Sequence, residues 1–433
     1  QMCIRDRDET AAHRSPETPG RAPAEPTQPG ALGRRGVLTT GAVGAAAGVL
    51  GAFPAPATAG TKEGRGAPGR GGRGGRMPLR FGRDGRFRIV QFNDTQGGHA
   101  ADRRTLEFMG KVLDQERPDF VLVNGDLLDG SPATDLQVKQ GVNNFVSPME
   151  NRGVPWAVTF GNHDEDSVEE HGTSMTEELI VEFLRQYRHN LNPVVDPAVP
   201  GESNMQLLVR GSRGPAPAFA IWLLDSGRYA SDADKAGQST EGLKDYDWIR
   251  PQQIRWYEQT SDATAQRYGR PVPGLMFFHI PTFEHAHMWY GSQGATDEAG
   301  HAEAVRRHRI EGVKHEDVYH GLFNSGIYAS VKERGEVKGI YCGHDHINTY
   351  KGDYYGVELG YAPGTGFDTY GLNDGTPDMH TLRGARVFDL DENAEGVYTG
   401  QTRLVWAKDL GIDMDPQPQP IDEPVAFPPY VKA

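Results

Sequence analysis

Short apolar runs of β-strand character end, one after another, in polar motifs along this chain. Five such motifs follow in a fixed order: Asp94-Thr95-Gln96, Gly125-Asp126, Gly161-Asn162-His163-Asp164, His279-Ile280-Pro281 and Gly343-His344-Asp345-His346. Each motif carries a carboxylate, a carboxamide or an imidazole, which are hard or borderline ligands for metal ions. Strands that end at one edge of a sheet would bring these side chains together. The pattern predicts two metal ions that share an aspartate, a site that hydrolyses phosphate esters.

The apolar runs also predict the fold. Strands at 86–93, 119–124 and 155–160 alternate with helices at 101–116 and 134–146, the second of which would end before Pro148. This β-α-β-α-β order predicts a parallel sheet with a polar loop after each strand. Further helices are expected at 175–187 and 251–260, and further strands at 206–209, 218–224, 275–278, 337–342, 347–350, 355–359, 386–390 and 402–406. The expected fold is α/β, with two facing mixed β-sheets flanked by helices in four layers.

The first 80 residues differ in composition from the rest, being rich in Gly, Ala, Pro and Arg with almost no aromatic residues. Arg34-Arg35 precede an uncharged stretch, 36–59, that ends in the small-x-small pattern Ala57-Thr58-Ala59. These features predict a cleaved twin-arginine signal within 1–59, read by the twin-arginine export machinery, and a secreted, periplasmic or cell-surface protein. The stretch is long enough for an uncleaved membrane anchor, but its Gly and Pro content and the cleavage pattern favour removal.

The remaining chain divides into three expected parts: a Gly/Arg-rich linker at 60–80, a domain at 81–412 and a Pro-rich, extended C-terminal tail at 413–433. Cys3 precedes the signal, so only Cys342 would remain after cleavage and no internal disulfide would form. The formal net charge of −14 belongs to the folded part, because the N-terminal region is basic. An acidic domain of this kind argues against stable binding to nucleic acids or to anionic membranes.

The motifs suggest individual roles. Asp126 is the best candidate for the bridging ligand, because one carboxylate offers two oxygens, although Gly-Asp alone is a common turn. Asn162 can bind a metal through its amide oxygen, and His163 beside it can protonate a leaving alkoxide, with Asp164 orienting the imidazole. A polar turn is the alternative for this tetrapeptide.

The histidines near the C-terminal end of the pattern differ in specificity. His344 and His346 are two residues apart, so an extended backbone would direct both rings to the same side. His279 is a weaker signal by itself, since a lone histidine at a strand end is usually structural, but its place between the other motifs favours a ligand.

These residues resemble the calcineurin-like metallophosphoesterase superfamily over about 87–390. The superfamily pattern is a DxH, a GDxxD or GDxxY, a GNH(D/E), a His before a variable turn and a GHxH, in that order. Further stretches are similar to the subgroup of purple-acid-phosphatase-like proteins of plants, fungi and bacteria. These stretches are Asp225-Ser226-Gly227, His279-Ile280-Pro281 with Glu284, Phe323-Asn324-Ser325-Gly326, Glu333-Arg334-Gly335 and Gly364-Thr365-Gly366-Phe367.

The resemblance implies two metal ions, of Mn, Fe or Zn, in a four-layer metallophosphoesterase sandwich. One ion would be held by Asp94, Gln96, Asp126 and His346, and the other by Asp126, Asn162, His279 and His344. A water or hydroxide between the ions would attack the phosphate ester. A phosphomonoester is the expected substrate; a phosphodiesterase and a catalytically silent metal-binding or scaffold protein are the alternatives.

Two positions depart from the pattern. Gln96 stands where the superfamily has a histidine, and an amide oxygen is a weaker ligand than an imidazole, which favours harder ions such as Mn²⁺. His99, three residues on, is an alternative donor for the first ion. Asp129 stands where true purple acid phosphatases have a tyrosine ligand, so no purple ferric chromophore is expected.

Overall fold

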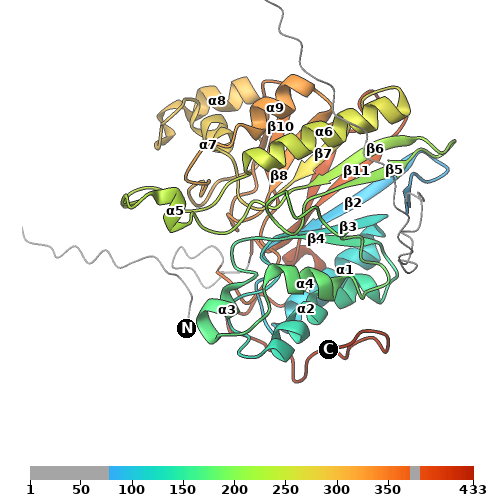
Figure 1. The fold of residues 1–433 in the computed structure, drawn as a ribbon, viewed down its shortest axis with the longest axis vertical. Coiled ribbons are helices and arrows are strands. Elements are labelled where there is room, and N and C mark those ends of the chain that lie inside the picture. The colour runs from blue at the N-terminus through green and yellow to red at the C-terminus, as the bar shows by residue number, and fades with distance from the viewer. Residues whose placement is uncertain (1–77, 371–380) are drawn as a thin grey trace, which may run out of the picture. The chain divides into compact units, whose positions relative to one another are not determined.

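The computed structural model of this protein describes residues 78–370 and 381–433, which form an α/β fold of four layers (Figure 1). This confirms the predicted pair of facing sheets flanked by helices. The expected signal and nearly all of the expected linker, residues 1–77, lie outside the described residues. None of the described helices combines the length and the apolar composition that crossing a membrane requires.

One sheet carries the first three predicted strands. Its order is β12-β11-β2-β3-β4, with bounds β2 (Arg86–Phe92), β3 (Phe120–Asn124), β4 (Trp156–Thr159), β11 (Gly384–Asp391) and β12 (Thr402–Trp406). β2, β3 and β4 are parallel, whereas β11 runs antiparallel to both β2 and β12. Phe92 lies opposite Val123, and Val123 lies opposite Val158, so the three parallel strands end side by side.

The other sheet has the order β1-β5-β6-β7-β8-β10-β9. Its bounds are β1 (Leu79–Arg80), β5 (Met205–Arg210), β6 (Pro217–Leu223), β7 (Gly274–Phe277), β8 (Val337–Cys342), β9 (Lys351–Tyr354) and β10 (Val357–Tyr361). β6, β7, β8 and β10 are parallel, and β5 and β9 are antiparallel to their inner neighbours. Both sheets therefore contain a parallel set of strands whose carboxyl ends carry loops.

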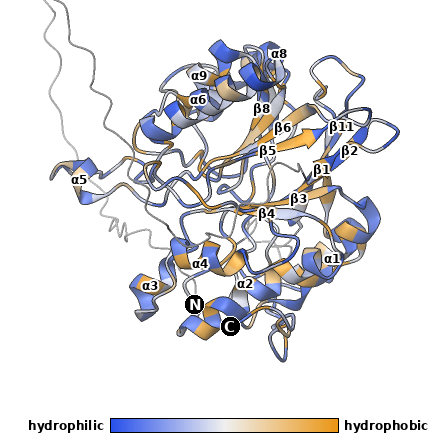
Figure 2. Ribbon diagram, turned by 45° about the vertical axis from the view of Figure 1, so that its right-hand side comes forward, coloured by the Kyte–Doolittle hydropathy of each residue, from blue (hydrophilic) through white to orange (hydrophobic). Residues whose placement is uncertain are grey.

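Helices cover the outer face of each sheet (Figure 1). α1 (Arg103–Glu116), α2 (Asp135–Glu150) and α4 (Glu177–Leu184) lie on the five-stranded sheet, and α6 (Pro251–Tyr268), α7 (Phe283–Tyr290), α8 (His301–His308) and α9 (Ile327–Arg334) lie on the seven-stranded sheet. Two short helices, α3 (Asp166–His171) and α5 (Asp232–Lys235), stand in loops. Figure 2 shows hydrophobic residues gathered on the strands and on the helix faces that meet them.

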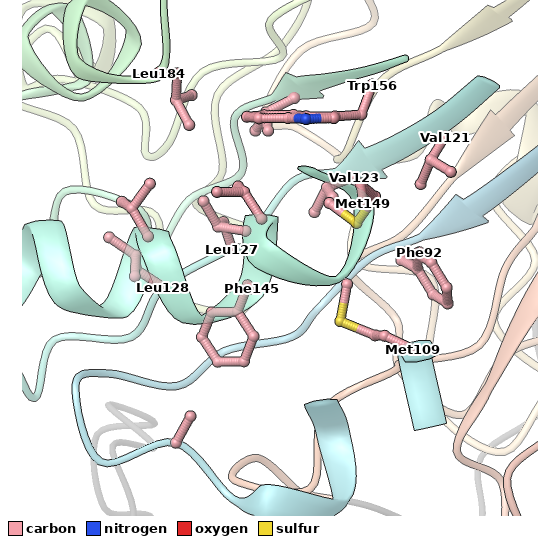
Figure 3. Packing of buried hydrophobic residues seen from close by; sticks show 14 of the residues in the cluster. Phe92, Met109, Val121, Val123, Leu127, Leu128, Phe145, Met149, Trp156 and Leu184 are labelled. Atoms are coloured by element: carbon pink, nitrogen blue, oxygen red, sulfur yellow. The ribbon is translucent and has the colours of Figure 1, made fainter. Parts of the chain in front are cut away.

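The core follows from the two-residue period of the strands. Val90 and Phe92 face outward and pack under the helices, where Phe145, Met149 and Trp156 complete the cluster (Figure 3). Phe87 and Ile89, on the opposite face of the same strand, are buried between the two sheets. β2 is apolar on both faces because it has a helix layer on one side and a second sheet on the other.

Two predicted elements need correction. α2 runs through Pro148 to Glu150, although proline lacks an N–H and its ring crowds the preceding turn. The helical hydrogen bonding resumes after it, since the Asn151 N–H donates to the Ser147 carbonyl at 2.9 Å. The strand predicted at 347–350 is instead β9, which begins at Lys351, since the residues after His344 form a turn in which Asn348 N–H donates to the Asp345 carbonyl at 3.1 Å.

The edges of the predicted domain also take part in the fold. Leu79, placed at the end of the expected linker, is buried and pairs with Val209 as part of β1. The C-terminal segment 413–433 has no helix or strand. It nevertheless lies along the domain, with Phe427 and Tyr430 packed against the core under α1, α2 and α4. The buried Arg104 donates to the carbonyls of Asp415 and Gln417 in this segment.

Candidate metal centre

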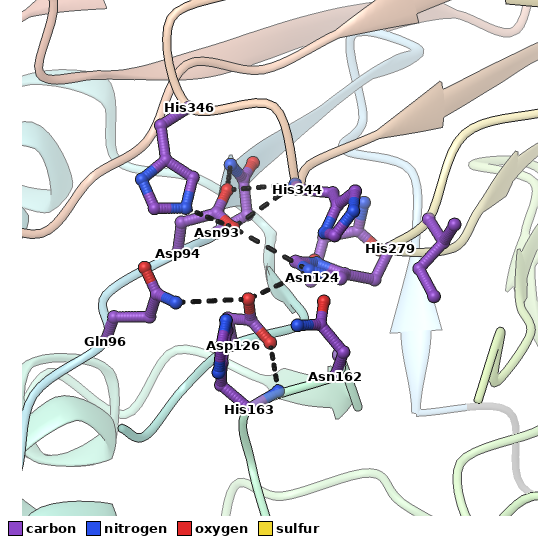
Figure 4. A network of polar contacts seen from close by, with 12 residues as sticks. Asn93, Asp94, Gln96, Asn124, Asp126, Asn162, His163, His279, His344 and His346 are labelled. Atoms are coloured by element: carbon purple, nitrogen blue, oxygen red, sulfur yellow. Dashed lines mark hydrogen bonds and ion pairs between the residues drawn. The ribbon is translucent and has the colours of Figure 1, made fainter. Parts of the chain in front are cut away.

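The predicted ligands come from both sheets and meet at one place (Figure 4). In the five-stranded sheet, Asp94 and Gln96 follow β2, Asp126 follows β3 and Asn162 follows β4; in the seven-stranded sheet, His279 follows β7, and His344 and His346 follow β8. All seven side chains are buried. The centre therefore lies at the carboxyl ends of the parallel strands, the usual position for a site in such sheets.

Two overlapping clusters of side chains at this centre have the geometry to hold metal ions. Asp126, His279 and His344 form one, and Asp94, Asp126 and His346 form the other, with one ligand atom of each residue within 4.8 Å of the others. Asp126 is the member common to both clusters. The carboxylates and imidazoles are divided between the two clusters as in the ligand sets that the family resemblance implied.

Amide and imidazole atoms at the centre also fit a metal. At this centre, Gln96 Oε1, Asn162 Oδ1 and His344 Nε2 are among the buried side-chain atoms of the described residues that have no hydrogen-bond partner. Buried polar atoms are seldom left unpaired, since each costs free energy unless it has a partner. The two amide oxygens are lone-pair donors, and His344 Nε2 can be one, so bound cations would satisfy all three atoms.

The backbone at the ligands is held in an uncommon conformation. Asp94, Gln96, Asp126 and His344 have positive φ angles of 51°, 32°, 51° and 72°. A left-handed conformation costs a non-glycine residue about 1–2 kcal/mol and clusters at functional sites. His344 therefore corrects one expectation: the backbone there is not extended, and a turn rather than strand alternation brings both His344 and His346 to the centre.

Two asparagines at the ends of β2 and β3 join the sheets beneath the centre. Asn124 Nδ2 donates to the carbonyls of Phe278 (3.1 Å) and Tyr341 (3.3 Å), and Asn93 Nδ2 donates to the carbonyl of Pro363 (3.2 Å). His279 Nδ1 lies 2.9 Å from the Asn124 carbonyl. Since that bond occupies Nδ1, Nε2 is left as the ligand atom of His279.

Close packing around the centre requires glycine before two ligands. A Cβ on Gly161 would lie 2.2 Å from Asp126 Oδ1, and a Cβ on Gly125 would lie 2.3 Å from His279 Nδ1. Gly125 also has a φ of 88°, which side chains rarely adopt. These two glycines let the strand ends approach the ligands closely.

The charges at the centre favour a cation. Burial lowers the pKa of His279, but the carboxylates of Asp126 and Asp94 outweigh it and raise the pKa to about 10. Burial likewise raises the pKa of Asp126, and the neighbouring His279 and His163 outweigh that effect and hold it below its usual range. The buried carboxylates thus bind positive charge, and a metal ion would compete with a proton for the imidazole.

His163 lies beside the clusters and is not a member of either. Its side chain is 26% exposed, and its backbone N–H donates to Asp126 Oδ1 at 2.9 Å. Burial lowers the pKa of His163, but Asp126 and Asp166 raise it to about 9 when no metal is bound. These carboxylates favour the protonated ring, and a general acid must be protonated before it acts.

Asp164 does not orient His163 as predicted. Its carboxylate instead accepts from the backbone N–H groups of Asp126 (3.1 Å), Leu128 (3.0 Å) and Gly161 (2.8 Å). The partner of the ring is Asp166, whose Oδ2 lies 2.5 Å from His163 Nδ1. Asp164 therefore connects the loops after β3 and β4 and stabilises the backbone around the centre.

The two departures from the superfamily pattern also have definite positions. His99 Nε2 contacts Gln137 Nε2 of α2 at 3.2 Å and lies in neither cluster, whereas Gln96 Nε2 lies 3.3 Å from Asp126 Oδ2. Asp129 Oδ1 accepts from the N–H of Ser131 at 3.0 Å and is likewise outside the clusters. Gln96, not His99, therefore lies beside Asp126, the residue common to both clusters.

Sequence reasoning missed four residues that contact the predicted ones. Asn93 and Asn124 are polar residues at the ends of apolar strands, directly before predicted motifs, and this position was a usable signal. Asp166 lies three residues after His163, which was a weaker one. Arg228 lies far away in the sequence, and only the fold brings it to Asp166.

Comparisons with known proteins identify the family of this chain and several relatives. Residues 87–348 match the family described as calcineurin-like phosphoesterase. A protein named "Probable inactive purple acid phosphatase 14" from Arabidopsis thaliana is 29% identical over 328 residues, which cover 68% of this chain and 74% of that protein. "Phosphatase DCR2" from Saccharomyces cerevisiae is 25% identical over 289 residues, covering 62% of this chain and 45% of that protein. A solved structure of a dimetal phosphatase from Danio rerio, 15% identical, covers 70% of this chain and 95% of its own with a TM-score of 0.40.

Proposed function

This chain belongs to the calcineurin-like phosphoesterase family, and from that premise we propose that it hydrolyses phosphate esters at two metal ions bound in the centre. The observation that carries the proposal is the buried Asp126, which is common to two clusters of ligand atoms. Phosphomonoesters are the proposed substrates, in keeping with relatives named as phosphatases. A phosphodiesterase reaction at the same centre is the alternative within this class.

The residues that would hold the ions are the seven assigned above. Asp94, Gln96 and His346 would complete one set with Asp126, and Asn162, His279 and His344 would complete the other. Bound there, two ions would lower the pKa of a water molecule and offset the negative charge of the phosphoryl oxygens. Buried imidazoles and amide oxygens suit Mn, Fe or Zn, and the neutral oxygen of Gln96 favours the harder ions.

We propose that His163 donates the proton to the leaving alcohol. With Nδ1 turned to Asp166, Nε2 is the ring nitrogen that remains to face a leaving group. Without bound metal, the carboxylates of Asp126 and Asp166 outweigh burial and raise the pKa of His163 to about 9. The part of His163 that is open to solvent allows an ester oxygen to reach it.

The experiment is to compare His163→Ala with the unchanged protein on two kinds of substrate. An alkyl phosphate needs a proton to expel its alkoxide, whereas a nitrophenyl phosphate expels a stable phenolate and needs it much less. The variant should keep both metals and lose roughly 10²–10⁴-fold in kcat on the alkyl ester, with a far smaller loss on the aryl ester. His171→Ala, at an exposed histidine of α3, should leave both rates unchanged. Equal losses on both esters together with loss of metal would make His163 a ligand and overturn the assignment.

A catalytically silent metal-binding protein is the second candidate, favoured by Gln96 at a histidine position and by the word inactive in the name of a relative. Metal content and turnover separate the two. Two ions per chain and hydrolysis of an aryl phosphate with added Mn²⁺ support the enzyme. One ion per chain and no turnover on monoesters, diesters, nucleotides or phosphoproteins support the silent protein.

We also propose that the chain is exported through the twin-arginine machinery and that its signal, within 1–59, is then removed. Arg34-Arg35, the uncharged stretch 36–59 and the pattern Ala57-Thr58-Ala59 support this proposal. The domain so released would act outside the cytoplasm, away from the membrane, and without binding nucleic acid, as its negative charge favours.

A further inference from the structure

A loop that carries none of the proposed ligands supports two loops that do. This support loop, 225–229, follows β6 and contains the stretch Asp225-Ser226-Gly227 that had no assigned role. Ser226 Oγ accepts from the N–H of Ile280 at 3.0 Å, next to His279. Tyr229 Oη accepts from Asn162 Nδ2 at 3.1 Å, which leaves the amide oxygen of Asn162 for a metal. The support loop therefore touches the segments after both β7 and β4.

Arg228 of the support loop begins a chain of charged contacts that ends at His163. Its Nη2 donates to Asp166 Oδ1 at 2.6 Å, and Asp166 Oδ2 lies 2.5 Å from His163 Nδ1. The side chains of Arg228 and Asp166 are 17% and 13% exposed. Hydrogen bonds between charged groups that are largely shielded from water are stronger and more directional than those of surface ion pairs.

Arg228 also holds the backbone on the other side of His163. Its Nε donates to the Asn162 carbonyl at 2.9 Å. One planar guanidinium thus fixes the residue before His163 and the carboxylate three residues after it. A guanidinium makes these two bonds at a set angle, which a lysine ammonium cannot reproduce.

We propose that Arg228 and Asp166 are positioning residues that hold the His163 ring with Nε2 toward the leaving group. The bond from Nδ1 to Asp166 fixes the tautomer and the rotation of the ring, and Arg228 fixes Asp166. The inference rests on the proposed role of His163 as general acid. It adds a part of the reaction machinery from β6, a strand that carries no predicted ligand.

A purely structural role for Arg228 is the competing explanation. Its guanidinium also lies 3.9 Å from Glu165 and 3.5 Å from Glu169, so it offsets several negative charges. Removal of that charge alone could loosen the loops. The test must therefore separate charge from geometry.

The test is a set of double mutants on the metal-loaded, full-length protein. Arg228→Lys, which keeps the charge, and Asp166→Asn should each keep both metals and the thermal midpoint while lowering kcat on an alkyl phosphate by about 10- to 10²-fold. KM should change little, and the loss on a nitrophenyl phosphate should be much smaller. In a His163→Ala background neither substitution should cause a further loss. Arg152→Ala, which breaks the distant Arg152–Asp114 pair, should leave both rates unchanged.

Three results would overturn the inference. Arg228→Lys with full activity on the alkyl ester would show that only charge matters. Additional losses in the His163→Ala background would show that the two residues act elsewhere. Loss of metal in either variant would place their effect on Asn162.

A measurement without turnover keeps this inference apart from the proposed function. In protein with ¹⁵N-labelled histidine, the Nδ1 proton of His163, identified by its loss in His163→Ala, should give a low-field, slowly exchanging NMR signal. Asp166→Asn and Arg228→Lys should remove or broaden it. If the protein hydrolyses no ester but shows this signal and its loss, the proposed function fails and the positioning contact stands. If the signal is absent from the unchanged protein, the positioning contact itself is wrong.

Discussion

Adding one methyl group at Gly161 should displace the ligand shared by both clusters. The Cβ of Gly161→Ala would lie 2.2 Å from Asp126 Oδ1, 2.6 Å from the Asp126 nitrogen and 2.7 Å from His279 Cδ2. The φ of Gly161 is outside the left-handed region, so alanine is compatible with the backbone conformation. The substitution therefore tests the steric contacts of the new methyl group, without added backbone strain.

The size of the effect follows from these distances. Ordinary contacts between heavy atoms begin near 3.5 Å, so the carboxylate of Asp126 must move by about 1 Å. Metal–ligand distances tolerate only about 0.2 Å, so this movement takes Asp126 out of reach of both ions. A displacement of about 1 Å at reacting groups costs roughly 10²-fold in rate. Overpacking should also lower the free energy of unfolding of the metal-free protein by about 1–3 kcal/mol.

The assay is metal content per chain after dialysis into a fixed metal buffer, together with kcat on a nitrophenyl phosphate and unfolding in urea. Gly214→Ala is the matched control, because a Cβ at Gly214 would have no heavy atom of the described residues within 4 Å, apart from its own chain neighbours. It should keep both metals and the full rate. Retention of both metals and a normal rate in Gly161→Ala would refute the packing argument, and loss of one metal alone would show that Asp126 is not shared.

Three further predictions concern other parts of the chain. Gln96→His should tighten binding of the more weakly held ion in a Zn²⁺ or Mn²⁺ titration, because imidazole is the better ligand; an unchanged affinity would remove Gln96 from the ligand set. Burial raises the pKa of Asp102, but the bonds from Arg104 and Gln419 outweigh it and hold the pKa below the ordinary 3.8. The folded state is therefore stabilised above that pH, and the free energy of unfolding in urea should fall as the pH drops below about 3.8, by less in Asp102→Asn; an equal fall in both proteins would contradict this. Replacement of Arg34 and Arg35 by Lys should leave precursor in the cytoplasm on cell fractionation, and unchanged export would contradict the twin-arginine assignment.

Much of the fold and the placement of the candidate ligands followed from the sequence, because a strand end is a local feature. Asp94, Asp126 and His279 each follow an apolar run, and parallel strands deliver such residues to one edge of a sheet. The two-sided burial of β2 is likewise visible as a run of apolar residues. Physical rules that act over a few residues were sufficient for these predictions.

The remainder depends on contacts between distant segments. Asp164 is adjacent to His163 and was predicted to orient its ring. The turn instead directs the Asp164 carboxylate to backbone N–H groups, and the His163 ring contacts Asp166. Arg228 reaches Asp166 only because β6 ends beside the loop after β4. The left-handed backbone at His344 comes from the turn that brings it to Asp94, whose carboxylate accepts from the His344 N–H.

The pairing of β11 with β2 affects when the centre can fold during synthesis of the chain. All seven proposed ligands have been synthesised once His346 is added, yet β2 still lacks its antiparallel neighbour, which spans 384–391. Until then β2 has an open edge, a template for wrong pairing with other chains. We therefore expect the centre to be completed only after nearly the whole chain is synthesised. If the chain is exported already folded, as proposed above, the ions it carries would be set by the metal supply of the compartment where it folds, not of the one where it works.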